Sequence, residues 1–176
     1  MYLIRQIHRV AKGDTILFHA AAGGVGLIAC QWAKSMGAIV IGTVGNEEKA
    51  KVAQAHGCDY PIIYTREDFV SRVMQITKAE KLPVVYDSVG KDTFMKSLDC
   101  LRPRGLMVSF GQSSGPIGPV DLGILAQKGS LFVTRPTLNT YAAKRADLLA
   151  MAQDLFAVVL SGAVCAVRPL SIIAAA

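Results

Sequence analysis

The segment Thr15-Ile-Leu-Phe-His-Ala-Ala-Ala-Gly-Gly-Val-Gly26 joins a short β-branched and aromatic run to a cluster of small residues. A helical pattern follows directly, from Leu27 to Lys34. A strand that ends in closely spaced small residues and leads into a helix is the fingerprint of a dinucleotide-binding βαβ unit. Ala21, Gly23 and Gly26 stand at its three small-residue positions. We therefore predict a Rossmann-type domain built around this turn.

The small residues of the turn have separate physical roles. The first shapes the tight turn, Gly23 has no Cβ to keep a pyrophosphate away, and Gly26 lets the helix pack closely on the strand. The amides of the first helical turn then face the phosphates, assisted by the positive end of the helix dipole. A glycine-rich turn can also be ordinary, but this one lies inside a βαβ unit. We predict that the diphosphate is bound by Ala22, Gly23, Gly24, Val25 and Gly26.

Six short strand-like segments alternate with helical segments along the chain. The strands are expected at residues 15–19, 39–43, 61–64, 84–86, 106–110 and 131–134, and the helices at 24–36, 47–56, 67–77, 92–101, 121–126 and 141–160. Strict alternation implies βαβ crossovers and a parallel sheet. The predicted fold class is therefore α/β, a doubly wound six-stranded parallel sheet with helices on both faces.

Local signals at the helix ends support this register. Asn46 is a natural N-cap for the second helix, and Gly57 suits a left-handed residue just after its end. Thr65 and Asp68 have the spacing of a capping box that opens the third helix. Each signal is small, but they agree with one another.

The overall composition limits the classes to which the chain can belong. With 176 residues it is sized for one domain, and 52% hydrophobic residues against 18% charged ones favour a sheet buried on both faces. No apolar run reaches the roughly 18 residues that cross a bilayer. The four cysteines lie far apart, without the close pairs of a zinc knuckle or a disulfide framework. We therefore expect reduced thiols in a cytoplasmic protein.

The formal net charge of +6 admits an anionic partner, which would be nucleic acid, membrane headgroups or a phosphorylated cofactor. The lysines and arginines are scattered, and they form neither a stripe nor an alternation with aromatic residues. Proteins that bind single strands use such an arrangement. A mildly basic, solvated surface is therefore favoured over a nucleic-acid interface.

The end of the second strand decides between NAD and NADP. An acidic residue about 20 positions after the glycines would bond the ribose hydroxyls of NAD, but this chain has GTVGN at residues 42–46. No carboxylate is therefore present there to repel a 2′-phosphate. Lys49 can supply a cation and Thr43 a hydroxyl, whereas Glu47 and Glu48 in the same turn count against a phosphate. Spacing alone leaves the role of Lys49 open.

Four segments are specific enough to indicate a family: AAAGGVG at 20–26, VVYDSVG at 84–90, GLMVSFG at 105–111 and GSLFVTRP at 129–136. With them the chain resembles, from about Leu3 to Val164, the NADPH-dependent quinone oxidoreductases. These are the ζ-crystallin-like, zinc-independent members of the medium-chain dehydrogenase/reductase superfamily. The resemblance implies that NADPH is the cofactor.

The resemblance also places individual residues along the cofactor. Lys49 falls at the lysine that pairs with the 2′-phosphate, and Tyr64 at the tyrosine beside it. Ser88 falls on the adenosine side of the cleft, although it would also serve as a turn residue. Phe110 falls near the nicotinamide side, although it would also fit the core. The rest of the nicotinamide side is implied at Gly111 and Ser113.

For the intact enzyme, the resemblance implies hydride transfer from NADPH to a quinone or a similar electron-poor acceptor. Reduction of an enoyl thioester or a haloacrylate stays open, because acceptor selectivity resides in a substrate domain that this sequence lacks. A module that holds NADP(H) or RNA without turnover is the alternative outside enzymes. No residue has the pattern of a catalytic acid, base or nucleophile, His19 is interpreted as structural, and no metal is predicted.

The resemblance divides the chain into three parts. Residues 1–12 are expected to be part of a helix that links to the substrate domain, residues 13–164 to be the NADP(H)-binding domain, and residues 165–176 to be a tail without an assignment. In this family the last strand of the sheet pairs with its two-fold mate. We therefore predict a homodimer through the edge strand Leu131 to Thr134.

Overall fold

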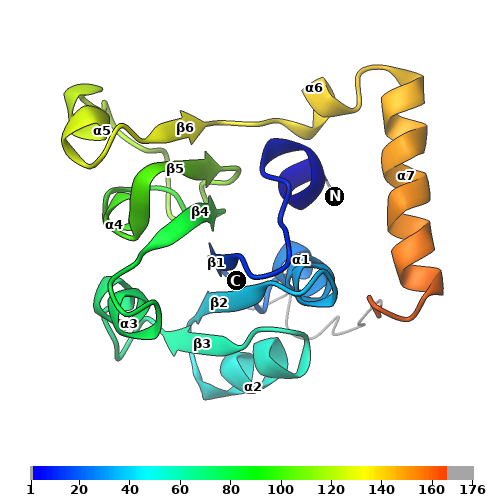
Figure 1. The fold of residues 1–176 in the computed structure, drawn as a ribbon, viewed down its shortest axis with the longest axis horizontal. Helices are drawn as coiled ribbons and strands as arrows, with labels where there is room; N and C mark the ends of the chain where they lie inside the picture. The colour runs from blue at the N-terminus through cyan, green and yellow to red at the C-terminus, as the bar shows by residue number, and fades with distance from the viewer. Residues whose placement is uncertain (1, 166–176) are drawn as a thin grey trace.

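The computed structural model describes residues 2–165, which contain one parallel sheet in the order β3-β2-β1-β4-β5-β6 (Figure 1). The strands are β1 (Thr15–Phe18), β2 (Ile39–Val44), β3 (Tyr60–Ile63), β4 (Leu82–Asp87), β5 (Leu101–Ser109) and β6 (Phe132–Thr134). This order is that of the dinucleotide-binding doubly wound fold. The strands β2 and β3 lie on one side of β1 and the strands from β4 onward on the other, so the topological switch point lies between β1 and β4. The predicted fold class is confirmed. The tail proposed at 165–176 lies, beyond Cys165, outside the described residues.

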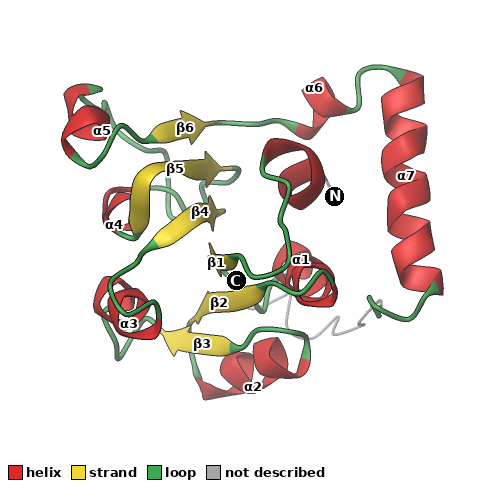
Figure 2. Cartoon of the chain, in the orientation of Figure 1, coloured by secondary structure: helices red, strands yellow, loops and turns green. Residues whose placement is uncertain are grey.

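Helices cover both faces of the sheet (Figure 2). They are the short π-helix η1 (Leu3–Ile7) and the α-helices α1 (Gly24–Ser35), α2 (Glu47–Ala55), α3 (Phe69–Ile76), α4 (Phe94–Asp99), α5 (Gly123–Gln127), α6 (Leu138–Tyr141) and α7 (Arg145–Leu160). None of the helices in residues 2–165 has the length and apolar character needed to span a membrane.

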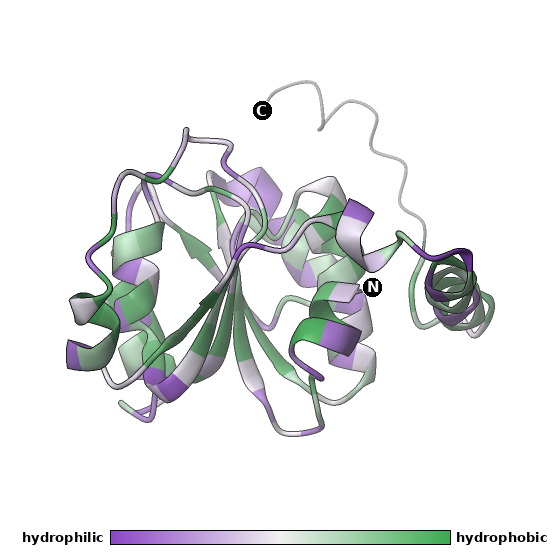
Figure 3. Ribbon diagram, turned by 90° about the horizontal axis from the view of Figure 1, so that it is seen from above, coloured by the Kyte–Doolittle hydropathy of each residue, from purple (hydrophilic) through white to green (hydrophobic). Residues whose placement is uncertain are grey.

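Two apolar layers hold the helices against the sheet. In β1, Ile16 and Phe18 belong to the core beneath η1, α1 and α2, whereas Leu17 belongs to the core beneath α3 and α4. This alternation follows from the two-residue period of a strand. Figure 3 shows the apolar strands enclosed between the two helix layers. The high hydrophobic content is therefore explained by a sheet buried on both sides.

The structure corrects the expected ends of two elements. β5 begins at Leu101, five residues before the predicted start at 106, because Leu101 pairs with Leu82 across a register shift. The long helix predicted from 141 starts only at Arg145 as α7, and the separate short helix α6 precedes it. In the first place backbone pairing, and in the second a non-helical segment at 142–144, overrides the side-chain pattern.

The capping predictions have different outcomes. The Asn46 side chain accepts a hydrogen bond from the Lys49 amide, and Gly57 adopts a left-handed φ of 89°, as predicted. The capping box of Thr65 is wrong, because Asp68 is itself the N-cap of α3 and accepts from the Ser71 amide.

The N-terminal segment belongs to the same core as the first βαβ unit. Leu3 and Ile4 of η1 are buried in the layer that contains α1. The other end of the described chain returns to α1 as well, since Gln31 hydrogen-bonds both the amide and the carbonyl of Cys165. Between them, α7 buries Met151 and leaves much of its apolar surface exposed.

The cysteines are all unpaired thiols. Cys30, Cys58 and Cys100 are buried, whereas Cys165 is exposed. Burial raises the pKa of the Cys30 thiol well above its usual value and raises the pKa values of Cys58 and Cys100 to about 12. The three buried thiols are therefore kept protonated at neutral pH.

Candidate nucleotide-binding site

The turn between β1 and α1 lies at the carboxyl end of the sheet, beside the point where the strand order reverses. Its left-handed residue is Ala20, with a φ of 55°, rather than a glycine. The Gly23 amide donates to the Ala20 carbonyl at 2.9 Å and closes the turn, and Gly23 is the N-cap of α1. The tight turn assigned to Ala21 from the sequence is thus centred one residue earlier, while Ala21 itself is fully buried.

The glycines differ in the space around them. A Cβ on Gly26 would lie 2.5 Å from the Ala20 carbonyl oxygen, so the helix packs against the turn as the fingerprint requires. A Cβ on Gly23 would lie 3.2 Å from the same oxygen, and one on Gly24 would meet nothing within 4 Å. Gly24 and Val25 are exposed, and the first-turn amides of a helix have no intrahelical acceptor. These amides are available to an anion in front of the turn.

A cavity of about 890 Å³ opens in front of this turn, a size within the range of small-molecule sites. Among the residues predicted from the sequence, those that line it are Ala22, Gly23, Gly24, Thr43, Lys49, Tyr64 and Ser113. The others, Val25, Gly26, Ser88, Phe110 and Gly111, are not part of its lining. The structure therefore brings the turn, the end of β2 and the start of α2 together around one space.

The end of β2 supplies Thr43, which the sequence presented as a hydroxyl for the cofactor. Its side chain is buried, and its oxygen lies 2.9 Å from Nδ1 of His19 and 3.3 Å from the Ala20 amide. The Thr43 carbonyl also accepts from the Ala21 amide at 3.0 Å. Thr43 therefore fastens the glycine turn to β2, and its hydroxyl is already engaged within the protein.

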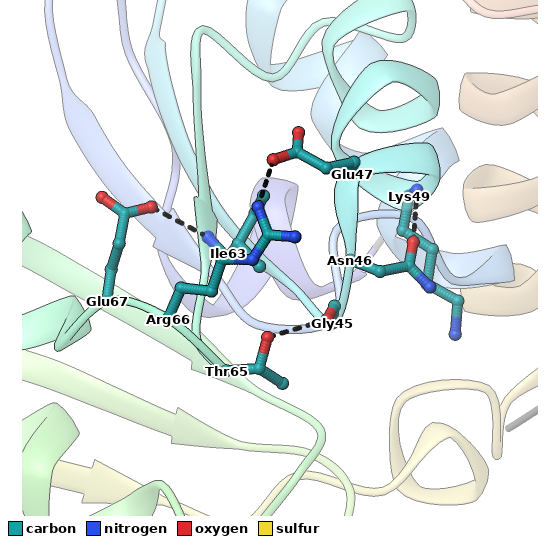
Figure 4. Close-up of polar contacts among 8 residues, drawn as sticks. All are labelled: Gly45, Asn46, Glu47, Lys49, Ile63, Thr65, Arg66 and Glu67. Carbon is teal, nitrogen blue, oxygen red and sulfur yellow. Dashed lines mark hydrogen bonds and ion pairs between the residues drawn. The ribbon is translucent and has the colours of Figure 1, made fainter.

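The rim of the cavity carries charges from the first turn of α2 and from the loop after β3 (Figure 4). Glu47, which counted against a phosphate in the sequence, forms an ion pair with Arg66 at 2.6 Å. Glu67 is likewise occupied, since its carboxylate accepts from the Ile63 amide at 3.3 Å and pairs with Arg72 at 2.8 Å. Glu47 and Glu67 are thus each compensated by an arginine, whereas the exposed Glu48 forms no ion pair with the described residues.

A hydrogen bond also joins the two loops at this rim. The Thr65 hydroxyl donates to the Gly45 carbonyl at 3.1 Å, which joins the loop after β3 to the loop after β2 (Figure 4). Tyr64 is 57% exposed, and a Cβ on Gly45 would lie 3.2 Å from its hydroxyl oxygen. The half-buried Lys49 lines the same cavity as the tyrosine. The cavity therefore has both a cation and a hydroxyl in its lining.

The opposite wall is formed by the loops after β4 and β5. Asp87 is fully buried, and its carboxylate accepts from the amides of Val89 and Gly90 and from the Thr93 hydroxyl. It therefore holds the loop after β4. The Ser113 amide donates to the Ser88 carbonyl at 3.1 Å, so the two loops are hydrogen-bonded to each other.

Two of the predicted residues that do not line the cavity have other structural roles. A Cβ on Gly111 would lie 2.5 Å from the Ser88 carbonyl oxygen, so only glycine allows the loops to touch there. The Phe110 ring lies 5.6 Å from the Phe18 ring and packs against the core. The core interpretation left open for Phe110 therefore describes its position.

Sequence reasoning assigned His19 a structural role and gave it no partners. Its imidazole is buried between β2 and α4, with Nδ1 near Thr43 and Nε2 at 2.9 Å from the Ser97 hydroxyl. Burial lowers the pKa of His19 to about 4, against a smaller opposite effect of Asp87. The side chain is neutral at physiological pH. No sequence signal linked His19 to Ser97, because the two are 78 residues apart.

No group of three His, Cys, Asp or Glu side chains within residues 2–165 is arranged to hold a metal ion. The charged residues of the cavity that sequence reasoning missed are Arg66, Glu67, Asp68, Asp92 and Lys96. Asp68 pairs with Lys96 at 3.3 Å. The charges that line the cavity therefore come largely as neutralised pairs, with Lys49 beside them.

Comparison with known proteins gives one family match and several close relatives. The family described as zinc-binding dehydrogenase matches residues 24–151. A quinone oxidoreductase of Pseudomonas aeruginosa is 58% identical over 92% of this chain and 50% of its own length. A 2-haloacrylate reductase of a Burkholderia species is 48% identical over 92% of this chain and 49% of its own length.

Among solved structures, the quinone oxidoreductase of Escherichia coli in complex with NADPH superposes with a TM-score of 0.93 at 52% identity. The match covers 97% of this chain and 52% of that one. The chain thus spans about half the length of the relatives that it matches.

Proposed function

Because the chain belongs to the zinc-binding dehydrogenase family, we propose that its cavity binds NADPH and that the chain is the cofactor-binding part of a quinone oxidoreductase. The observation that carries this proposal is the turn from Ala20 to Gly24, which presents first-turn amides to a cavity with Lys49 and Tyr64 at its other end. The similar structure from E. coli was solved with NADPH.

The residues present fit a dinucleotide with a 2′-phosphate. The missing Cβ atoms at Gly23 and Gly24 leave the amides of α1 open to a diphosphate, and the positive end of the helix dipole favours it. Lys49 and Tyr64 would hold the 2′-phosphate, because β2 ends without a carboxylate and Arg66 offsets Glu47. The wall at Ser113 would face the nicotinamide side.

When bound, NADPH supplies the hydride, and the protein's part is to orient the nicotinamide and to keep water away from it. The hydrogen-bonded loops after β4 and β5 would form the wall against which the ring rests, since Asp87 and the Ser88 carbonyl hold both loops. A quinone is the proposed acceptor. A haloacrylate is the second candidate, because the Burkholderia reductase is 48% identical.

The edge strand and the cysteines bear on the oligomeric state, the zinc independence and the cellular compartment that we propose. The edge strand β6 exposes Phe132 and Val133, 60% and 40%, which suits pairing with a second copy in a homodimer. Within residues 2–165 no cysteine belongs to a group of three His, Cys, Asp or Glu side chains that could hold a metal ion, which supports a zinc-independent member of the family. Free thiols suit a reducing cytoplasm.

Binding affinities for NADPH and NADH, measured by calorimetry for the wild type and for Lys49→Ala, test the proposal. The substitution should weaken NADPH by roughly 10- to 100-fold, the value of one charge-assisted hydrogen bond, and leave NADH unchanged. Lys51→Ala is the matched control, because Lys51 is exposed on the same helix and does not line the cavity. Equal binding of both cofactors by all three proteins would contradict the assignment.

A second measurement separates an enzyme from a binding module. Consumption of NADPH with a simple quinone, or with 2-chloroacrylate, identifies the acceptor class. Cofactor binding without either reaction favours a module, and an RNA gel shift that NADPH abolishes would favour shared use of the cavity. From the part of the protein that this chain represents, we expect weak binding and little turnover.

A further inference from the structure

His19 connects two layers of the structure behind the glycine turn. It is the first residue after β1, and strand alternation directs its side chain to the same face as Leu17, toward α3 and α4. There the ring meets Phe69 edge-on, with ring centroids 5.0 Å apart, and bonds Ser97 of α4. Its other nitrogen bonds Thr43 at the end of β2. A single buried side chain thus joins α4, β2 and the start of the turn.

Thr43 transmits this connection to the backbone of the turn. Its hydroxyl oxygen accepts from the Ala20 amide and its carbonyl accepts from the Ala21 amide. Ala20 has a φ of 55°, a conformation that non-glycine residues rarely adopt and keep only where neighbours enforce it. The two bonds from Thr43 enforce it here, and the Ala20 carbonyl in turn accepts from the Gly23 amide.

The Thr43 oxygen accepts from the Ala20 amide and is hydrogen-bonded to Nδ1 of His19, and Nε2 of His19 is hydrogen-bonded to the Ser97 hydroxyl. A hydroxyl donates one proton and accepts two, so both tautomers of a neutral His19 fit this network. Burial against Phe69 keeps the ring neutral, although Asp87 of β4 favours the charged form.

We propose that His19 is a positioning residue for the cofactor's diphosphate: through Thr43 it holds Ala20 in its left-handed conformation and so aims the amides that follow. This inference rests on the proposed binding of NADPH. His19 touches no part of the 2′-phosphate end, where Lys49 and Tyr64 lie at the far side of β2. Its effect is therefore confined to ligands that carry a diphosphate.

A purely structural histidine would behave differently. Loss of a core residue lowers stability and weakens all ligands of the folded protein equally or not at all. A positioning residue alters one end of the site and spares the other. The two roles are distinguished by comparing NADPH with adenosine 2′-monophosphate, which has the 2′-phosphate but no diphosphate.

The test uses two variants of the full chain that remove the same aromatic ring. In His19→Asn, the side-chain amide takes the place of Nδ1 and retains a hydrogen bond with Thr43 in either direction, whereas in His19→Gln the amide reaches toward Ser97 instead. We expect His19→Gln to weaken NADPH roughly tenfold, as one lost hydrogen bond does, with His19→Asn within about threefold of wild type. Adenosine 2′-monophosphate should bind all three proteins alike.

Thr43→Val removes the same link from the other partner while it keeps the shape of the side chain. It should repeat the selective loss of NADPH, which makes the test independent of whether the His19 variants fold. Equal NADPH affinity in wild type, His19→Gln and Thr43→Val would overturn the inference. Equal weakening of NADPH and adenosine 2′-monophosphate in the variants would overturn it as well. Either result would leave the proposed function standing. A wild type that binds neither ligand would instead remove the proposed function, and this inference with it.

Discussion

The Nη1 atom of Arg66 lies 2.6 Å from the Oε1 atom of Glu47 across the rim of the cavity. Both side chains are more than half exposed, so the pair adds little to the stability of the fold. Its significance is electrostatic, because Glu47 occupies the same first turn of α2 as Lys49. Without Arg66, a free carboxylate would stand beside the place proposed for the 2′-phosphate.

Removal of Arg66 should therefore weaken NADPH selectively. Arg66→Ala is expected to lower NADPH affinity roughly 3- to 10-fold at low salt without changing NADH, and Glu47→Gln to raise NADPH affinity by a similar factor. The exposed Arg102 at the start of β5 provides the control for net charge in Arg102→Ala. If the NADPH to NADH ratio responds to Arg102→Ala as much as to Arg66→Ala, overall charge and not the pair governs selectivity. Salt should reduce both effects.

Two glycines of the turn should respond in opposite ways to a methyl group. Gly26→Ala places a Cβ 2.5 Å from a backbone oxygen and should destabilise the fold by about 1–3 kcal/mol in denaturant unfolding. Gly24→Ala meets no protein atom within 4 Å, so stability should be unchanged while NADPH affinity falls roughly tenfold through crowding of the diphosphate. Unchanged stability in Gly26→Ala would show that the helix can move away from the turn.

Stability should decline with acid through His19. The pKa of its side chain is about 4 in the fold against 6.5 in an unfolded chain, so between these values the unfolded state binds the extra proton. The contribution of the neutral ring is complete above pH 6.5 and is lost as pH falls toward 4, amounting to about 3 kcal/mol. Asp68, whose pKa is lowered chiefly by the Ser71 amide, titrates below this window.

Unfolding free energies at pH 7 and pH 4.5 measure this effect. His19→Gln should flatten the pH dependence between these values, since glutamine does not titrate. Retention of the wild-type slope in the variant would assign the acid sensitivity to other groups.

Exposed apolar residues on β6 give the dimer prediction a direct test. Light scattering at micromolar concentration should report a dimer for the wild type and a monomer for Phe132→Lys, because a charged side chain on an edge strand disfavours pairing. Leu160→Lys is the control, since Leu160 is 87% exposed on α7, away from that edge. A monomeric wild type would remove the prediction.

Sequence reasoning identified the sheet because each strand contains a short apolar or β-branched run, and the period of two in β1 determines its two faces. It also named residues that line the cavity: the turn residues through their own local sequence, and Lys49 through the family resemblance. It failed at Leu101 and Asp68, where a backbone pair or a nearer acceptor decided the boundary.

The contacts that the sequence could not reveal join residues far apart in the chain. Glu47 and Arg66 are 19 residues apart, and His19 and Ser97 are 78 residues apart. The pattern of one segment does not show which distant side chain will form an ion pair or a hydrogen bond with a residue of that segment. For that reason the sequence alone shows neither that Arg66 pairs with Glu47 nor that His19 is linked to the turn.

The contrast between three buried thiols and an exposed one makes this chain selectively labelable. A maleimide dye reacts with thiolates, and at neutral pH those of Cys30, Cys58 and Cys100 are suppressed by burial. Cys165 would take the dye alone, next to Gln31 on the helix whose first turn faces the cavity. A fluorophore there would act as a reporter on α1, so that ligand titrations could be followed optically without altering any residue.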